Sequence, residues 1–344
     1  MKQKQSKIEG IRSVDFKIVA KGHGVVNWNG STRLNIDGHN KAINNHSLPK
    51  LRGYTNITYI TDKDTKQEYA YKNVNDIDFK KTPLYISQNC IRHHLFREDS
   101  FLDFQSKEVQ ENVDKLLCSI VGLVRGYVIP TTKEQKRTSA LLLEDFVDIS
   151  PEPTGNFEQM CKAGTKERKE NKQGKEASIS LFSKTTFGDT EYKSYGSISI
   201  EQLQFISLDN KFSREAMNCD SEKERQSLAK KMTSFLNELG ETDKAEAIYH
   251  NNYVRNGSIY DIGERGILLN DIAIDILVKK TLDLIENLTI RQAKGYMYVD
   301  SIEIDYNDSS KAKDMMRVKR TEEGNYDIRK EKGTLNYAQY FVGV

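Results

Sequence analysis

Alternating apolar and polar residues predict the first and last strands of the chain. Near the start, every second position is apolar, at Val14, Phe16, Ile18 and Ala20. A period of two places such side chains on one face of a β-strand. A similar alternation in residues 295–306 predicts a strand late in the chain. Both strands are expected to lie with one face against the core.

Apolar residues at helical spacing predict four helices between these strands. The first begins at Ser87, because serine caps helix N termini well. The second covers 108–125, where an apolar stripe recurs every three to four residues. The third covers 222–239 and ends at Gly240, and the fourth covers about 270–287.

The middle of the chain is predicted to contain a loop and a hairpin. Residues 150–178 combine prolines and glycines with a lysine-rich, nearly all-polar stretch, which predicts a loop. Two β-prone runs follow in residues 178–207, and Gly188 with Asp189 between them predicts a hairpin turn. Residues 31–80 are rich in turn formers and predict an irregular insertion.

The predicted elements follow the order strand, helix, irregular strands, hairpin, helix, strand. This is the β-α-β-β-α-β order of a ferredoxin-like or RRM-like sheet. We therefore predict the α+β class and a single RRM-like (ferredoxin-like) domain over residues 1–344. Large insertions are expected at about 27–82 and about 150–197.

Composition indicates a soluble globular protein. Of the 344 residues, 37% are hydrophobic and 30% are charged. No stretch approaches the roughly 20 apolar residues of a membrane span, and the charged first ten residues lack the apolar core of a secretory signal. The four cysteines lie far apart without a CxxC pair, which indicates reduced thiols. We expect a cytoplasmic protein with no membrane partner.

The net charge of +2 argues against a protein that coats nucleic acid by bulk charge alone. Its distribution is uneven. Residues 1–50 hold nine Lys and Arg against three Asp and Glu, whereas residues 201–250 hold seven against ten. A nearly neutral chain can therefore carry one basic groove, although an offset of this size is also common on ordinary surfaces.

The sequence lacks the common local motifs of catalysis and of metal or phosphate binding. It contains no GxxxxGK[ST], GxGxxG, HExxH, DxDxDG or GxSxG motif. His93 and His94 are adjacent, so on a helix they point to different sides and cannot chelate a metal as an i, i+4 pair does. We expect no enzyme, no metal and no cofactor.

Polar side chains that suit RNA share one face of the helix after Ser87. That face carries Asn89, Arg92, His93 and Phe96. The free N–H groups at the start of the helix would also favour a phosphate. The alternative is a plain amphipathic helix whose polar face is solvated.

Two further segments combine cations with aromatic rings. In LPKLRGYTN (48–56), an extended chain would place Lys50, Arg52 and Tyr54 on one face, which suits RNA contact or a lysine-protected edge strand. Near the predicted turn at Gly188, lysines and rings suit RNA stacking, or the rings pack into the body or a neighbouring subunit. These are Lys184, Phe187, Tyr192, Lys193 and Tyr195. KRTS (136–139) and IRQAK (290–294) add further cations.

Seven stretches resemble a known family. They are KGHGVVNWNG (21–30), LPKLRGYTN (48–56), TPLYISQNCIRHHLFRE (82–98), KRTSALLLEDFVD (136–148), LFSKTTFGDTEY (181–192), SYGSISIEQLQFISLD (194–209) and LTIRQAKGYMYVD (288–300). Together they resemble the crRNA-binding backbone subunit of the CRISPR Cascade complex in the type I-F variant, a Csy-type member of the RAMP superfamily. The lysine-rich stretch 162–178 is longer than this family leads one to expect.

The resemblance implies a hand-shaped protein with an RRM-like palm, finger insertions and a thumb β-hairpin. Copies would polymerise along crRNA as a helical filament and leave its spacer free to pair with target DNA, so that base pairing reads the sequence. It also implies other Cascade subunits as partners and a separate helicase-nuclease that cuts the target. The subunit itself would have no nuclease activity.

The resemblance assigns RNA contacts to three groups of residues. The palm helix that faces the crRNA backbone corresponds to Ser87, Gln88, Asn89, Arg92 and His93. The thumb corresponds to Lys184, Phe187 and Lys193. Further groove candidates are Lys50, Arg52, Lys136, Arg137, Arg291 and Lys294.

Two other functions remain open on the sequence. A metal-independent CRISPR RNA-processing endoribonuclease would use a histidine as general base, and His23 and His93 are its candidates. A protein-only scaffold would form ordered oligomers without nucleic acid.

Overall fold

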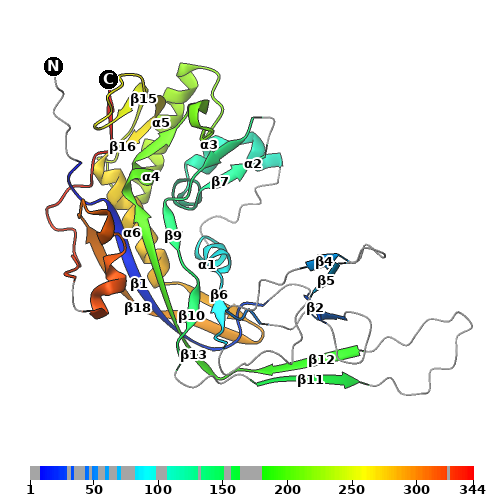
Figure 1. The fold of residues 1–344 in the computed structure, drawn as a ribbon. Helices are drawn as coiled ribbons and strands as arrows, with labels where there is room; N and C mark the ends of the chain where they lie inside the picture. Colours follow the sequence, from blue (N-terminus) through cyan, green and yellow to red (C-terminus); the bar gives the residue numbers. More distant parts are fainter. Residues whose placement is uncertain are drawn as a thin grey trace, which may run out of the picture.

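The computed structural model places most of the chain in one body, from which a two-stranded hairpin projects (Figure 1). It describes residues 8–28, 32–34, 43–45, 49–52, 59–61, 68–70, 82–97, 107–130, 133–150, 156–162, 180–323 and 326–344. Among these residues, no helix has the length and apolar character needed to span a membrane.

The largest sheet is antiparallel and has seven strands, and it contains both strands predicted from alternation. Six strands run in the order β17-β18-β1-β13-β10-β6, and β9 pairs with β13. The members are β1 (Ser13–Gly24), β6 (Tyr85–Ile86), β9 (Leu141–Leu143), β10 (Phe146–Asp148), β13 (Asp189–Ser199), β17 (Thr289–Gln292) and β18 (Gly295–Asn307). The predicted first and last strands, β1 and β18, are direct neighbours.

The inner face of β1 forms the centre of the core. Val14, Phe16 and Ile18 are fully buried, and each such side chain contributes about 1.5–3 kcal/mol of transfer free energy. Behind this face runs α6 (Asp271–Glu286), which packs against β18 (Figure 1). The alternation predicted from the sequence is therefore confirmed by burial.

The opposite face of the sheet, here called the outer face, is covered at one end only. Asp15 is fully buried there and accepts hydrogen bonds from Ser197 Oγ (2.5 Å) and Asn307 Nδ2 (2.9 Å). The 3-10 helix η5 (Arg317–Glu323) closes this end, where Arg317 pairs with the buried Asp305 at 2.6 Å. Towards the other end of β1, Lys21 and His23 on this face are exposed.

Three of the four predicted helices form as expected. They are α1 (Gln88–Leu95), α5 (Glu222–Leu239) and α6. The predicted cap of α1 is confirmed, because Ser87 Oγ accepts a hydrogen bond from Cys90 N at 3.4 Å. α5 starts with a capping box in which Ser221 and Glu224 each bond the other's backbone N–H.

The prediction of one helix over 108–125 is wrong. The segment divides into α2 (Lys107–Glu111), α3 (Val113–Leu117) and the π-helix η2 (Val121–Arg125). The Asn112 side chain donates to Glu108 O at 2.8 Å, which is a local bond that competes with the helix. Gly122 lies so close to Leu116 O that a Cβ would come within 1.9 Å, so the chain folds back on itself. The apolar stripe is nevertheless buried.

The predicted hairpin turn at Gly188 is also wrong. β12 (Ser180–Thr186) pairs with β11 (Asn156–Lys162), and β13 leaves this hairpin to join the main sheet. Gly188 O accepts from Gly24 N at 3.0 Å, so Gly188 joins the hairpin to the sheet. β11 also replaces part of the loop predicted at 150–178.

A second, four-stranded sheet was not predicted. Its order is β14-β16-β15-β19, and its strands are β14 (Phe205–Ser207), β15 (Ala247–Arg255), β16 (Glu264–Leu269) and β19 (Phe341–Gly343). The short helix α4 (Ile200–Gln204) connects β13 to β14. This sheet draws on distant parts of the chain, and α5 packs against β15.

The remaining elements are short. β2 (Thr32–Leu34) pairs with β3 (Ile43–Asn45), β4 (Tyr59–Thr61) with β5 (Glu68–Ala70), and β7 (Tyr127–Ile129) with β8 (Gln135–Arg137). Two 3-10 turns are η3 (Asn210–Phe212) and η4 (Ala312–Asp314). Within the predicted insertion at 27–82, Leu51 is fully buried and bridges Leu84, so the chain returns to the body there.

Candidate nucleic-acid interface

Three predicted RNA-binding residues line one groove on the body. The groove has a volume of about 400 Å³ and lies where β9, β10 and β13 meet the start of α1. We call it the central groove. Its lining consists of Arg52, Gln88, Leu143, Glu144, Asp145, Val147, Ile149, Lys193 and Tyr195. Arg52, Gln88 and Lys193 come from segments far apart in the sequence, and the fold brings them together.

The start of α1 is already bonded to a carboxylate. Gln88 N donates to Asp145 Oδ1 at 3.0 Å, and Ser87 N donates to Asn27 Oδ1 at 3.1 Å. A carboxylate is favourable at a helix N terminus for the same reason that a phosphate is. The N–H groups predicted to receive a phosphate are thus partly used inside the protein, while the side chains of Gln88 and Asn89 are exposed.

Arg52 is held at the groove by the same carboxylate. Its Nη1 lies 2.9 Å from Asp145 Oδ2, and its side chain is 54% exposed. An ion pair this exposed contributes about 0–1 kcal/mol, so Arg52 can exchange Asp145 for a phosphate at little cost. The alternation predicted for 48–56 holds at this point, because Leu51 is buried between Lys50 and Arg52. Tyr54 lies outside the described residues.

Lys319 contacts two residues of the groove lining, and sequence reasoning missed it. Its ammonium lies 4.7 Å from the centre of the Tyr195 ring and pairs with the Glu144 carboxylate. It comes from η5, which the sequence pattern did not predict. The basic run MRVKR (316–320) was the only local signal, and nothing in it points to the groove.

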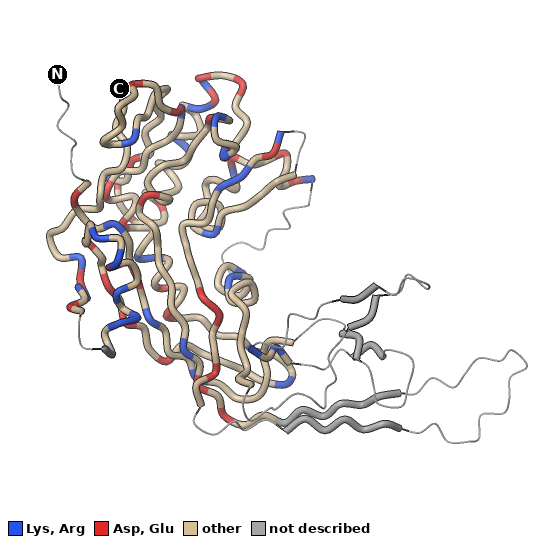
Figure 2. The backbone as a smooth tube through the Cα atoms, viewed as in Figure 1, with Lys and Arg blue, Asp and Glu red and all other residues tan. Residues whose placement is uncertain are grey.

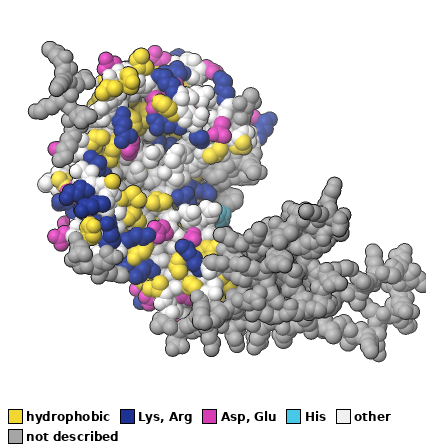
Figure 3. All heavy atoms as spheres, viewed as in Figure 1, with side chains coloured by type: hydrophobic (Ala, Val, Ile, Leu, Met, Phe, Trp, Pro, Cys, Tyr) yellow, Lys and Arg dark blue, Asp and Glu magenta, His cyan; other side chains and the backbone are white. Residues whose placement is uncertain are grey.

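The turn between β9 and β10 is acidic (Figure 2). It carries Glu144, which pairs with Lys319, and Asp145, which pairs with Arg52. On the face shown in Figure 3, lysine and arginine side chains likewise lie beside acidic and hydrophobic ones. The groove can offer cations and the Tyr195 ring to a nucleotide. The carboxylates of Glu144 and Asp145 reduce the positive electrostatic potential there.

The polar face predicted for α1 divides into structural and exposed parts. Arg92 Nη2 donates to Leu141 O at 2.5 Å, so Arg92 ties α1 to β9. Burial lowers the pKa of the Arg92 guanidinium, and the nearby Arg125 lowers it further. His93 is exposed and lies edge-on to His94, with ring centres 5.3 Å apart. Phe96 is buried, so its placement on an RNA-facing side was wrong.

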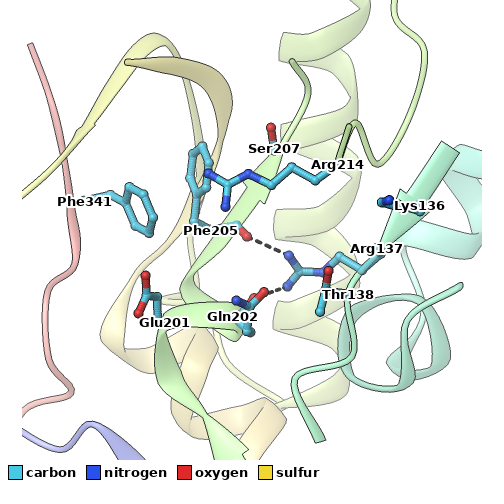
Figure 4. A pocket seen from close by; sticks show the side chains of 9 residues that line it. All are labelled: Lys136, Arg137, Thr138, Glu201, Gln202, Phe205, Ser207, Arg214 and Phe341. Carbon is cyan, nitrogen blue, oxygen red and sulfur yellow. Dashed lines mark hydrogen bonds between the residues drawn. The ribbon is translucent and has the colours of Figure 1, made fainter. Parts of the chain in front are cut away.

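The placement of Arg137 in the groove is wrong. Arg137 is 6% exposed, and its guanidinium donates to Phe205 O (2.6 Å) and Gln202 O (2.5 Å) at the end of α4 (Figure 4). Alternation along β8 turns Arg137 inward and Lys136 outward. Lys136 pairs with Glu134 at 3.3 Å. Neither residue lines the central groove.

The residues predicted for the thumb do not lie together, because the hairpin is formed by β11 and β12 and not around Gly188. The backbone of Lys184 lies in β12, and its side chain lies outside the described atoms. Phe187 is half-buried against the core, and Tyr192 is fully buried. Lys193 and Tyr195 therefore reach the groove from β13 of the main sheet and not from a hairpin tip.

The last two candidates lie on the β17–β18 hairpin. Arg291 is exposed and pairs across the strands with Tyr296. The Lys294 ammonium lies 4.9 Å from the Trp28 ring centre, and Lys50 lies 6.0 Å from the Tyr85 ring centre. None of the three cations lines the central groove.

The groups in the central groove suit binding to a phosphate backbone and a base. Arg52 and Lys319 can neutralise phosphates, and the Tyr195 ring can stack. Among the described residues, no cluster of three or more His, Cys, Asp and Glu could hold a metal ion. Burial raises the pKa of the thiols of Cys118 and Cys219 to about 11, so neither is an activated nucleophile.

Comparison with known proteins identifies one family. Residues 10–344 match the model of a family described as "Type I-Fv CRISPR-associated protein Cas7fv-like". A search of curated proteins finds no match. The matched range includes every segment that lines the central groove.

Proposed function

The chain belongs to the Cas7fv-like family of type I-Fv CRISPR-associated proteins, and from this premise we propose that it is a non-catalytic, crRNA-binding backbone subunit. Copies oligomerise along the crRNA, hold its phosphate backbone and present the spacer for pairing with target DNA. The other Cascade subunits and a recruited helicase-nuclease complete the assembly in the cytoplasm.

The observation that carries this proposal is the convergence on the central groove. Arg52, Gln88 and Lys193 line the groove together with Tyr195, and Lys319, from a fourth segment, lies 4.7 Å from the centre of the Tyr195 ring. Cations beside an aromatic ring are the combination that binds single-stranded RNA without sequence preference.

The sheet order supports an RRM-like palm. β13 lies between β1 and β10 in the sheet, and α1 lies between β1 and β10 in the chain. α6 then connects β13 to β18, which returns beside β1. This is the split β-α-β connectivity of ferredoxin-like sheets. In the same reading, the β11–β12 hairpin is the thumb.

Salt-dependent RNA binding tests the proposed function. We expect fluorescence anisotropy with a labelled 30-nucleotide RNA to show affinity that falls steeply between 50 and 200 mM salt. Arg52→Ala with Lys319→Ala removes two phosphate contacts, so the slope of log K against log salt should fall by about 1.4, at about 0.7 per contact on a single strand. The loss should be equal for RNAs of different sequence.

Lys230→Ala is the matched control, because Lys230 is an exposed cation on α5, outside the groove. Two results would exclude the central groove as the site that binds the RNA phosphate backbone. One is an RNA affinity that does not change with salt concentration. The other is an equal loss of affinity in Lys230→Ala and in the Arg52→Ala, Lys319→Ala double variant.

The RNA recovered from these binding mixtures also tests whether the protein is an endoribonuclease. His23 Nδ1 lies 2.8 Å from Asp189 Oδ1, an arrangement that could orient a general base. We expect denaturing gels to show intact RNA. Specific products that disappear in His23→Ala would favour the enzyme.

A further inference from the structure

Two exposed tyrosines mark a second surface on the outer face, beside the central groove but not part of its lining. Tyr296 and Tyr298 are 50% and 41% exposed, while Met297 between them is fully buried. In the antiparallel register, Tyr296 lies opposite His23 and Tyr298 opposite Lys21. Directly paired residues point to the same face of a sheet. We call Tyr296, Tyr298, His23 and Lys21 the aromatic shelf.

Two rings of the shelf pack against each other. The His23 and Tyr296 rings are nearly parallel, with centres 6.2 Å apart and planes 26° apart. His23 Nδ1 also lies 2.8 Å from Asp189 Oδ1. Gly22 lets β1 and β18 approach closely, since a Cβ there would lie 2.4 Å from Tyr296 O. Rings that are already ordered lose little entropy on binding, so they suit stacking.

A depression lies directly on the shelf. Its volume is about 400 Å³, and its lining includes Lys21, Ser150, Thr190, Glu191 and both tyrosines. This volume falls within the roughly 300–1,000 Å³ of small-molecule sites, so it can accept a planar group. The depression borders the start of β13, at the root of the β11–β12 hairpin.

The charged groups on and around the shelf are mainly acidic. Lys21 lies 3.0 Å from Asp300, and Glu191 lies opposite Lys21 in the sheet. His23 is paired with Asp189. One lysine faces three carboxylates here, so the shelf offers no excess of cations to attract phosphates. At the central groove, by contrast, Arg52, Lys193 and Lys319 outnumber Glu144 and Asp145. A ligand held here is recognised through its rings.

We propose that the aromatic shelf stacks an unpaired nucleobase of a single-stranded nucleic acid. The proposal rests on the proposed RNA-binding function and adds a base-stacking site to the phosphate site in the central groove. Its ligand is a flat base with no sequence requirement, because every base has a π-face. The strand is either the guide RNA or a DNA strand.

Abasic oligomers separate stacking from phosphate contact. The probes are a labelled 20-nucleotide oligouridine, an abasic ribose oligomer of the same length and charge, and oligothymidine. Loss of stacking costs about 1–3 kcal/mol per base, so Tyr296→Ala with Tyr298→Ala should bind oligouridine or oligothymidine about 5- to 150-fold more weakly. Binding of the abasic oligomer and the salt slope should not change.

Two further variants control this experiment. Tyr296→Phe with Tyr298→Phe keeps the rings and should bind like the wild type. Tyr260→Ala removes a tyrosine that is 70% exposed on the turn after β15 and should have no effect. A loss with oligouridine alone assigns the strand to RNA, and a loss with oligothymidine alone assigns it to DNA.

Three results would overturn the proposal: no loss in the alanine variant, an equal loss with the abasic oligomer, or an equal loss in Tyr260→Ala. In these cases, salt-dependent binding through Arg52 and Lys319 would still support the proposed function. If the wild type binds none of the oligomers, both the proposed function and the shelf fail.

Discussion

At the scale of single residues, Arg137 shows how a buried cation can serve structure alone. Its guanidinium donates to the backbone carbonyls of Gln202 and Phe205. Burial lowers the pKa of Arg137 to about 10, so the side chain still carries its charge at neutral pH. The carbonyls at the end of α4 carry partial negative charge, which offsets part of the cost of burying that charge.

Replacing Arg137 should destabilise the fold without a specific effect on RNA. Arg137→Met leaves several buried carbonyls without donors, at about 1–3 kcal/mol each, so we expect about 3 kcal/mol of lost unfolding free energy in urea. Lys136→Met, on the exposed side of the same strand, should change the unfolding free energy by less than about 0.5 kcal/mol. Equal urea midpoints for the two variants would contradict the structural role.

At the scale of elements, α5 shows a helix whose start is specified locally and whose end is set by packing. Ser221 and Glu224 form the capping box, and Gly240 follows the last turn. Gly240 has an ordinary φ of −97°, so its role is spatial. A Cβ at this position would lie 2.3 Å from Ile276 Cδ1, which places the end of α5 against α6.

Removing the cap of α5 should weaken the helix by a predictable amount. Ser221→Ala loses the hydrogen bond from Glu224 N (3.2 Å), so we expect about 1 kcal/mol of destabilisation in thermal or urea unfolding. Ser234→Ala is the matched control. Ser234 lies on the exposed side of the same helix and bonds only backward to Lys230 O, so its loss should be neutral or slightly stabilising. A control that loses as much stability as Ser221→Ala would refute the capping role.

Other elements could not be placed from local signals. The apolar stripe of 108–125 predicted a single helix, yet Asn112 and Gly122 divide it through contacts within the turn and with Leu116. The β-prone runs on either side of Gly188 predicted a hairpin turn there, but the structure has none. Strand formers show that strands exist, but not which strand each one pairs with.

At the scale of the whole molecule, the protein combines a nearly neutral chain with one groove of converging cations. The groove depends on contacts between distant segments, such as Lys319 with Glu144 and Arg52 with Asp145. Composition therefore says little about whether a phosphate backbone could bind there, because net charge does not report how charges are arranged.

Assembly on RNA should occur in steps of whole subunits. We expect mass photometry with RNAs of 30, 60 and 90 nucleotides to show complexes whose protein mass rises in multiples of 39.5 kDa with RNA length. This follows if each copy covers a fixed length of backbone. Ordered oligomers of the same size without RNA would instead favour the protein-only scaffold.

The sequence by itself determined the local periodicities and caps, and it carried the family resemblance. β1, β18, α1, α5 and α6 follow from side-chain spacing and from local signals such as the cap at Ser87, because those signals act within a few residues. Tertiary structure alone decided strand pairing, the second sheet, the burial of Arg137 and the arrival of Lys319 beside Tyr195. These features depend on which distant segments bury their surfaces against each other. The spacing of residues along the chain does not determine which segments do so.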